Sequence, residues 1–288
     1  MYSIRDLNRL RLYCLAFLLP CVALAFISLA FLFFAISPNV NLGFVFPFVM
    51  FLLFGTAFVF MLRMYRKKHT EYMKSYIANV RKIAFANEFD GCTVNKGHIP
   101  TEILEKLEII RPREKVNFIE TFSASYDDTP FESAYFETEG GFFGQIFIYT
   151  YDEKFKRNAL IRQRGFITAG GGEYEGLEKY TTGNSMFDYA FTAMAQSQKD
   201  GQIMLIEPVL QEFLRFRLHT SAKIMASFEE QKLYIVLQNP KRHFDIPLFL
   251  GLEINSLKEA ALSESRLVNT ISSNLKIEKD IWRKYSSD

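Results

Sequence analysis

A glycine-rich stretch holds the residues whose types come closest to a ligand-binding pattern. Gly171 lies at the centre of three consecutive glycines, and Glu173 and Glu175 follow it. Backbone N–H groups of such glycines can surround a phosphate, but phosphate loops also need a lysine, a hydroxyl residue and a following helix. This stretch lacks those features, and its glutamates would repel phosphate. We therefore interpret residues 165–183 as a mobile surface loop of the kind that often carries binding function.

His243 and Asp245 are the second group of candidates, because they lie close together in the segment that ends at Pro247. We take Gly171, Glu173, Glu175, His243 and Asp245 together as the candidate ligand or partner surface. A deep pocket lined by His243, Asp245 and the glutamates would favour an enzyme or a ligand binder. A flat apolar patch would instead favour a protein partner.

Other patterns that would support catalysis or metal binding fail on spacing. The four histidines form no HExxH or H-x-H pair, and the three cysteines show no CxxC spacing suited to zinc. No G-x-S-x-G nucleophile motif occurs. Asp127 and Asp128 adjoin where a turn is expected, and a magnesium site would need further carboxylates. The sequence therefore predicts no catalytic residue, no metal site and no cofactor. This favours a protein that is not an enzyme without deciding the question.

Nucleic-acid binding has one supporting feature and one opposing feature. Arg157, Arg162 and Arg164 lie near two phenylalanines, and basic and aromatic residues interleaved on a strand can stack bases. Three of the 34 basic and one of the 32 acidic residues precede residue 12, which leaves 31 of each in residues 63–288. A domain with zero net charge offers little attraction to phosphates. We expect no nucleic-acid partner.

Hydrophobic periodicity predicts the elements that must position these residues. Alternation with period two predicts strands over about 118–123, 131–138, 142–151 and 159–164, and a hairpin of 223–228 with 232–238. Helical spacing predicts helices over about 65–89, 100–110, 207–218 and 256–285, whereas 187–196 fits either state. Short links favour antiparallel neighbours. The fold class is α+β: an N-terminal two-helix transmembrane hairpin, then a soluble domain with a mainly antiparallel sheet and packed helices.

The hairpin is predicted from a stretch of 51 residues, 12–62, without any Asp, Glu, Lys or Arg. A membrane span needs roughly 20 apolar residues, so this stretch is long enough for two. Turn formers around Pro38 divide it into spans of about 12–36 and 44–62. Two alternatives are weaker. Core helices of a soluble protein seldom run so long without charge, and a cleaved signal peptide has a shorter apolar run.

Charges beside the spans predict the orientation. Arg5, Arg9 and Arg11 precede the first span, and the second is followed by Arg63, Arg66, Lys67 and Lys68. Basic residues in short flanks favour the cytoplasmic side. We therefore expect a multi-pass protein of the bacterial inner membrane with both termini in the cytoplasm. The same basic residues suit contact with anionic lipid.

A set of aromatic and apolar motifs resembles a known family. The motifs are Phe143-Gly144-Gln145-Ile146-Phe147, Phe187-x-Tyr189-x-Phe191, Leu205-Ile206-Glu207-Pro208, Ser227-Phe228, Lys232-Leu233-Tyr234-Ile235 and Phe244-Asp245-Ile246-Pro247-Leu248-Phe249. Behind a two-span hairpin, this order is similar to bacterial membrane-anchored proteins catalogued as Domain of Unknown Function 3137. The resemblance covers about 117–281 and implies the fold. It implies no activity, cofactor or catalytic residue.

These observations predict three segments and rank three functions. The segments are a transmembrane hairpin (1–64), a basic juxtamembrane helix and linker (65–112), and a cytoplasmic α+β domain (113–288). We expect an interaction or scaffold module whose partners are the lipid bilayer and a protein or second copy of the chain. The first alternative is a small-ligand binder or enzyme that uses the Gly170 loop and His243. The second is an oligomeric transport subunit.

Overall fold

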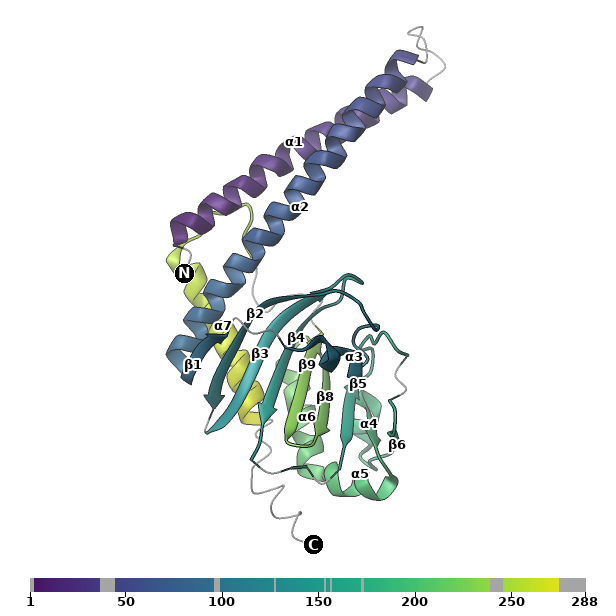
Figure 1. Ribbon diagram of the computed structural model, residues 1–288, viewed down its shortest axis with the longest axis vertical. Coiled ribbons are helices and arrows are strands. Elements are labelled where there is room, and N and C mark those ends of the chain that lie inside the picture. The colour runs from purple at the N-terminus through teal and green to yellow at the C-terminus, as the bar shows by residue number, and fades with distance from the viewer. Residues whose placement is uncertain are drawn as a thin grey trace. The chain divides into compact units, whose positions relative to one another are not determined.

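The computed structural model describes residues 3–36, 45–95, 99–126, 128–152, 154–155, 157–171, 174–238 and 246–274 (Figure 1). The chain divides into two compact units. The first, which we call the hairpin unit, contains Met1–Val80 and Asp245–Glu259. The second, the sheet unit, contains Arg81–Phe244 and Ala260–Asp288.

Two long helices dominate the hairpin unit. α1 spans Ile4–Ile36 and α2 spans Val45–Glu88, and both are long and apolar enough to cross a membrane. Only 11% and 6% of the residues in their most apolar windows are buried, whereas the core helices of soluble proteins are mostly buried. The rings of Phe31 and Phe54 stack between the helices at 5.5 Å. The predicted pair of apolar helices is confirmed.

A segment from far along the chain completes the hairpin unit. The Tyr72 hydroxyl of α2 donates to the Pro247 carbonyl at 2.5 Å. The Asn8 side chain of α1 exchanges two hydrogen bonds with the backbone of Leu252, at 3.0 and 3.1 Å. Residues 246–252 are thereby bound to both helices. The apolar pattern of the spans did not predict this contact, because polar side chains outside the spans make it.

An antiparallel sheet forms the sheet unit. Its strands are β1 (Asp90–Asn95), β2 (Val116–Tyr126), β3 (Thr129–Thr138), β4 (Phe143–Thr150), β5 (Ala159–Gln163), β6 (Glu178–Tyr180), β7 (Phe191–Ala195), β8 (Lys223–Glu229) and β9 (Lys232–Gln238). Within the described residues they follow the order β1-β2-β3-β4-β9-β8-β5-β7-β6. The expected α+β fold class, with an antiparallel sheet and packed helices behind two apolar helices, is confirmed.

The order of the strands differs from their order along the chain. β2, β3 and β4 are neighbours, as their short links predict. β4 then pairs with β9, where Gln145 lies opposite Leu237, and β5 pairs with β8, where Ile161 lies opposite Ala226. The β8–β9 hairpin therefore separates β4 from β5. The expectation that β5 neighbours β4 is wrong, because a distant hairpin satisfies the backbone groups of both strands.

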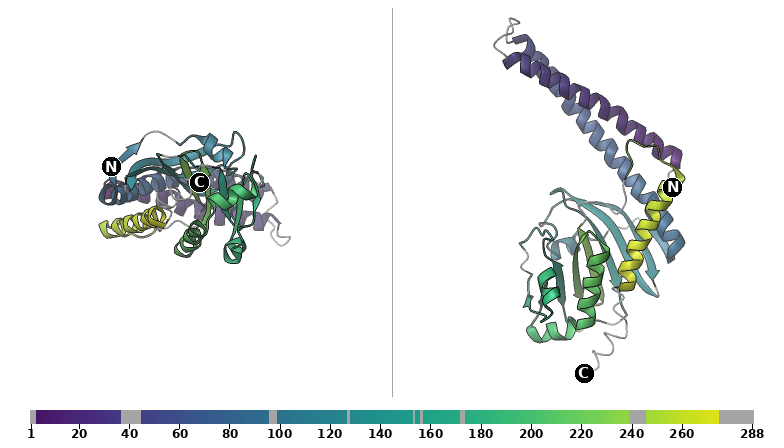
Figure 2. Two further views of the ribbon diagram at one scale, coloured as in Figure 1. Left: turned by 90° about the horizontal axis from the view of Figure 1, so that it is seen from below. Right: turned by 180° about the vertical axis from the view of Figure 1, so that it is seen from behind.

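Both faces of the sheet are covered. On one face, Phe213 of α6 (Glu207–His219) packs against the rings of Phe191 and Phe228 at 6.3 and 6.4 Å. Figure 2 shows α6 and α7 (Ile254–Asn274) on the same face of the sheet. The opposite face carries an apolar cluster that joins Leu104 of α3 (Thr101–Lys106) to strand residues. Full burial of an apolar side chain such as Leu104 or Phe213 stabilises the folded state by roughly 1.5–3 kcal/mol relative to leaving it exposed.

Short helices and strands occur where the sequence pattern was ambiguous or predicted a loop. The ambiguous stretch 187–196 becomes α4 (Ser185–Ala190) followed directly by β7. The Asn184 side chain caps α4 by accepting from the Phe187 N–H at 3.0 Å. Strands β1 and β6 and helix α5 (Gln198–Met204) were not predicted. They are too short for a periodic pattern, and their partners are distant in sequence. α7 confirms the last predicted helix as far as Asn274, and its expected extension to 285 lies outside the described residues.

Candidate functional site

The structure describes only part of the predicted ligand surface. Gly171 is exposed and has a positive φ of 80°, and Glu175 is exposed as well. Glu173, His243 and Asp245 lie outside the described residues, so whether they meet Gly171 stays a prediction. What the structure does show is a set of basic side chains around the glycine loop.

A cleft of about 400 Å³ lies between the glycine loop and the strands β5, β6 and β7. We call it the Arg162 cleft, and the lining residues that matter below are Arg162, Arg164, Thr168, Gly171, Lys179 and Thr192. Strand register explains why these side chains meet. Arg162 lies opposite Thr192 on β7, and Lys179 lies opposite Met194, two residues further along β7. Side chains two residues apart on a strand share a face.

Two arginines of the Arg162 cleft are held by specific contacts. The Arg162 guanidinium lies 5.8 Å from the centre of the Tyr174 ring and donates to the Thr168 hydroxyl at 3.4 Å. Arg164 donates to the Asp188 carbonyl at 2.9 Å. Burial raises the pKa of Tyr174 to about 12, so its phenol is neutral at pH 7. The loop itself is fixed where the Ala169 N–H donates to the Glu108 carbonyl at 2.7 Å.

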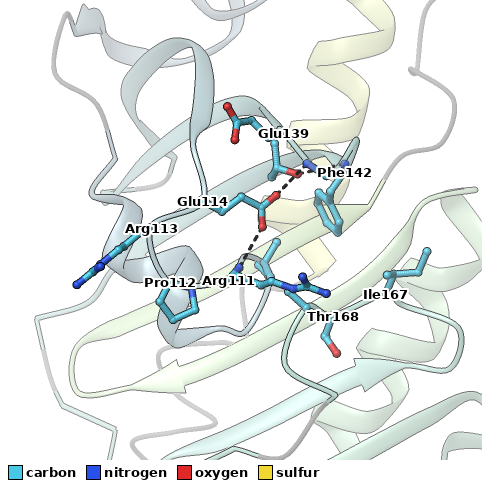
Figure 3. Close-up of a pocket in the computed structure, with 12 residues that line it drawn as sticks. Arg111, Pro112, Arg113, Glu114, Glu139, Phe142, Ile167 and Thr168 are labelled. Carbon is cyan, nitrogen blue, oxygen red and sulfur yellow. Dashed lines mark hydrogen bonds between the residues drawn. The ribbon is translucent and has the colours of Figure 1, made fainter.

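A second hollow, of about 610 Å³, adjoins the cleft, and Thr168 lines both (Figure 3). Figure 3 shows Arg111 extended on the side of Thr168, whereas Arg113 points away. The Glu114 carboxylate accepts the N–H groups of Arg111 at 3.1 Å and of Gly140 at 3.0 Å. These backbone hydrogen bonds, first that from Arg111 and then that from Gly140, lower the pKa of Glu114 below its ordinary value. Glu114 therefore closes the turn after β3 and is already engaged as an acceptor.

The chemistry of the two hollows follows from their charges. Among the described residues that line them, the second hollow has the acids Glu114 and Glu139 beside its arginines, whereas the Arg162 cleft has only basic charges. No group of three or more His, Cys, Asp or Glu residues that could hold a metal occurs within the described ranges. The Arg162 cleft is thus suited to hold an anion. Sequence reasoning noted Arg162 and Arg164 but missed Lys179, which only the unpredicted strand β6 brings to them.

The basic flanks of the spans are mostly exposed. Arg5, Arg9, Arg63, Arg66 and Lys67 are exposed, and Lys68 is half-buried beside Glu71 at 2.8 Å. Arg11 differs, because its side chain is buried and donates to the Leu248 carbonyl at 3.5 Å. Arg11 therefore has a structural contact in addition to its charge.

Comparison with known proteins finds one matching family model and a distant solved structure. A family model described as a protein of unknown function, DUF3137, covers residues 141–277. The predicted resemblance to DUF3137 is confirmed over this range. The chain has no match among curated proteins. Among solved structures, the crystal structure of the mycobacterial trehalose monomycolate transport factor A, TtfA, aligns with a TM-score of 0.36 and 8% identity, over 68% of this chain and 95% of that chain. A similarity this low supports no inference about function.

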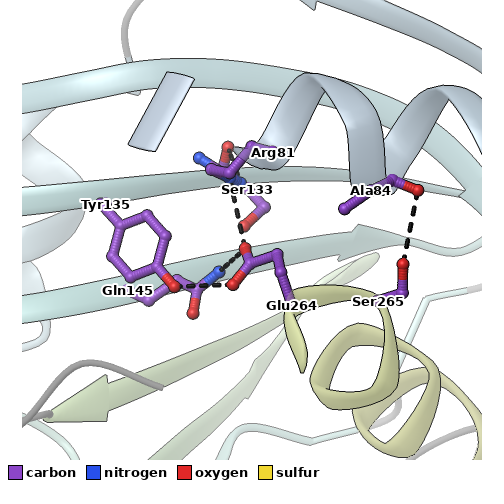
Figure 4. Close-up of polar contacts among 7 residues, drawn as sticks. All are labelled: Arg81, Ala84, Ser133, Tyr135, Gln145, Glu264 and Ser265. Carbon is purple, nitrogen blue, oxygen red and sulfur yellow. Dashed lines mark hydrogen bonds and ion pairs between the residues drawn. The ribbon is translucent and has the colours of Figure 1, made fainter. Parts of the chain in front are cut away.

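A buried polar network joins residues matched by the DUF3137 model to α2 (Figure 4). Glu264 of α7 accepts from the Tyr135 hydroxyl at 2.7 Å and from the Gln145 amide at 3.0 Å, and its carboxylate lies 3.4 Å from Arg81 Nε. Arg81 also donates to the Ser133 carbonyl at 3.0 Å. Arg81 and Glu264 are fully buried. The network holds helices on the sheet, and its two charged residues are closed off from solvent, so we assign it a structural role.

The sequence carries a signal for this network. Glu264 lies between Ala261 and Val268 on the apolar stripe of its helix, where a charge is out of place. Arg81 lies in the same way between Ile77 and Ala84. Charged residues are almost never fully buried unless they are paired, so two such residues on apolar stripes predict each other as partners.

Proposed function

We propose that this protein is a bacterial inner-membrane scaffold, which holds a cytoplasmic α+β interaction domain at the bilayer and is not an enzyme. The composition of the hairpin unit supports the proposal. The hairpin unit combines the two apolar helices with residues 246–252. These residues follow the last strand of the sheet in the sequence and are hydrogen-bonded to α1 and α2. The chain therefore returns to its membrane helices after building the sheet. A simple tether would need no such return.

The connections between the units add to this support. The chain passes between the units three times: within α2 at residues 80 and 81, between residues 244 and 245, and within α7 at residues 259 and 260. Two of the three passages thus occur inside helices. Covalent attachment through two separate helices suits a domain that is to stay at the membrane.

The orientation rests on the basic flanks. Arg5, Arg9, Arg63, Arg66 and Lys67 are exposed at the N-terminal end of α1 and along α2 beyond its apolar run, and 37–44 contain no charged residue. Translocating basic flanks is disfavoured, so the termini and the sheet unit are assigned to the cytoplasm and 37–44 to the other side. The exposed basic residues then lie where anionic lipid headgroups attract them, by about 1 kcal/mol each.

Cysteine labelling tests this orientation. Asn39→Cys and Ser287→Cys are introduced separately into a variant whose three native cysteines are replaced. A membrane-impermeant maleimide applied to intact spheroplasts is expected to label position 39 only, and position 287 after permeabilisation. Labelling of position 287 in intact spheroplasts would overturn the cytoplasmic assignment.

Copurification tests the scaffold role. The full chain, solubilised in a mild detergent, is expected to carry a stoichiometric protein partner or a second copy of itself. The matched control is residues 1–64 fused to an unrelated soluble protein, which keeps the spans and loses the sheet unit. A partner bound equally by the control, or no partner and no self-association with the full chain, would count against the scaffold role.

A further inference from the structure

We propose that the Arg162 cleft is a binding site for a phosphate-type oxyanion. The inference concerns the sheet unit alone, and it holds or fails independently of the scaffold role. It rests on three observations: the charge of the cleft, the contacts that hold its arginines, and the positions of the nearby carboxylates.

The charge of the cleft is one-sided. Arg162, Arg164 and Lys179 line it, and no acid occurs among its described lining residues. A fourth cation is close, because the Lys223 Nζ lies 3.9 Å from the place where a Cβ on Gly165 would stand. Cations that line one cleft repel one another, and an anion bound between them offsets that repulsion.

The arginines keep donors for a ligand. A guanidinium carries five N–H donors, whereas Arg162 engages the Thr168 hydroxyl and the Tyr174 phenol and Arg164 engages the Asp188 carbonyl. Arg162 is half-buried and lies over the Tyr174 ring, which limits its rotamers. A guanidinium fixed in this way is pre-organised for two parallel hydrogen bonds to an oxyanion.

Two described carboxylates near the cleft, those of Asp188 and Glu108, lie outside its lining. A carboxylate oxygen of Asp188 accepts both the N–H and the hydroxyl of Thr182, at 3.2 and 2.9 Å. Glu108 approaches the glycine loop, where its carboxyl group lies about 3 Å from a Cβ position on Gly170. Gly170 and Glu108 are outside the set of residues that line the cleft.

The cleft volume of about 400 Å³ accommodates a phosphate together with part of the molecule that carries it. Two sources share this chemistry: a soluble phosphorylated molecule and the headgroup of an anionic phospholipid. The two sources are separated by experiment and not by the geometry of the cleft.

Calorimetric titration of the full chain in an uncharged detergent tests the site at low ionic strength. The soluble probe is inorganic pyrophosphate. The lipid probe is dihexanoyl phosphatidic acid below its micellar concentration, with dihexanoyl phosphatidylcholine as its zwitterionic control. We expect one of the anions to bind and the zwitterion not to bind. Binding of pyrophosphate alone identifies a soluble ligand, and preference for the acidic lipid identifies a headgroup.

Charge-neutralising variants assign the binding to the cleft. Arg164→Gln and Lys179→Gln change exposed side chains, so they test the site without removing buried packing. Each is expected to weaken binding by roughly ten-fold or more, as loss of a charge-assisted hydrogen bond does. Arg162→Lys keeps the charge and loses the planar fork, so it is expected to weaken binding as well.

The matched control is Arg217→Gln, because Arg217 is exposed on α6, which covers the other face of the sheet. This variant should bind as the unaltered chain does. Equal weakening by Arg217→Gln would show binding through net charge only and overturn the assignment. Failure of the unaltered chain to bind either anion would overturn the proposal.

Discussion

The Glu264 carboxylate on α7 lies 3.4 Å from Arg81 Nε on α2, and neither side chain is exposed to solvent. The Arg81 guanidinium also lies 4.7 Å from the centre of the Phe122 ring and 5.2 Å from that of Tyr135. Two buried charges are costly to desolvate, and their mutual attraction with good hydrogen bonding offsets that cost. Two distant parts of the chain are thereby held to one place on the sheet.

Replacing one partner of this pair is expected to destabilise the fold more than replacing both partners together. Glu264→Leu leaves Arg81 buried without its counter-ion and should lower the free energy of unfolding by about 3–5 kcal/mol. The double variant Arg81→Met with Glu264→Leu should cost less than the sum of the two single changes. Urea unfolding of the detergent-solubilised chain, followed by circular dichroism, measures both. Additive costs would contradict the assigned coupling.

Gly201 of α5 is expected to resist substitution because of the Tyr180 ring. A Cβ at residue 201 would lie 2.5 Å from a ring carbon of Tyr180, and a rigid ring cannot give way as the end of a flexible chain does. Gly201→Ala should therefore destabilise the sheet unit by about 1–3 kcal/mol, although alanine favours helix by about 1 kcal/mol. Thermal unfolding measures the difference. Gly251→Ala is the control, since a Cβ there meets no atom within 4 Å.

Glu114 makes the turn after β3 sensitive to acid. Its folded-state pKa lies below the ordinary value of 4.5, chiefly because it accepts the Arg111 N–H and then the Gly140 N–H. A lowered pKa stabilises the fold fully above the ordinary pKa, and that stability is lost as the pH falls through the folded-state pKa.

Glu114→Gln is therefore expected to lower the free energy of unfolding at pH 7 by about 0.5 kcal/mol, since Glu114 is only half-buried and solvent screens its charge. At pH 3 the variant and the unaltered chain should differ less. Urea titrations at the two pH values give the comparison, and an equal difference at both would show that the charge of Glu114 is irrelevant.

Asn8 is expected to protect one backbone amide. It accepts from the N–H of Leu252, a residue that is only 5% exposed, and donates to the Leu252 carbonyl. Asn8→Ala should speed hydrogen exchange of the peptide that contains Leu252 by about ten-fold, the equivalent of one hydrogen bond. Asn8→Asp keeps the acceptor and should preserve most of the protection. Unchanged exchange in Asn8→Ala would show that this contact does not hold residues 246–252 in place.

Much of the fold was predictable from local patterns. The 51-residue charge-free stretch predicted two apolar helices, and alternation in 131–138 and 232–238 predicted β3 and β9. The insertion of β8 and β9 between β4 and β5 was not predictable, because strand pairing depends on long-range contacts that alternation does not encode. The short strand β6 escaped detection for the same reason, and with it the place of Lys179 in the Arg162 cleft.

The sequence by itself determined the division into an apolar hairpin and a charge-balanced domain, the two apolar helices, and the resemblance to DUF3137, which was predicted over about 117–281 and is matched over 141–277. These follow from composition and period, which are local properties of the chain. Only the tertiary structure decided that Glu264 meets Arg81 and that Lys179 joins Arg162 and Arg164. Such pairings join residues far apart in sequence, and packing against the shared sheet selects them.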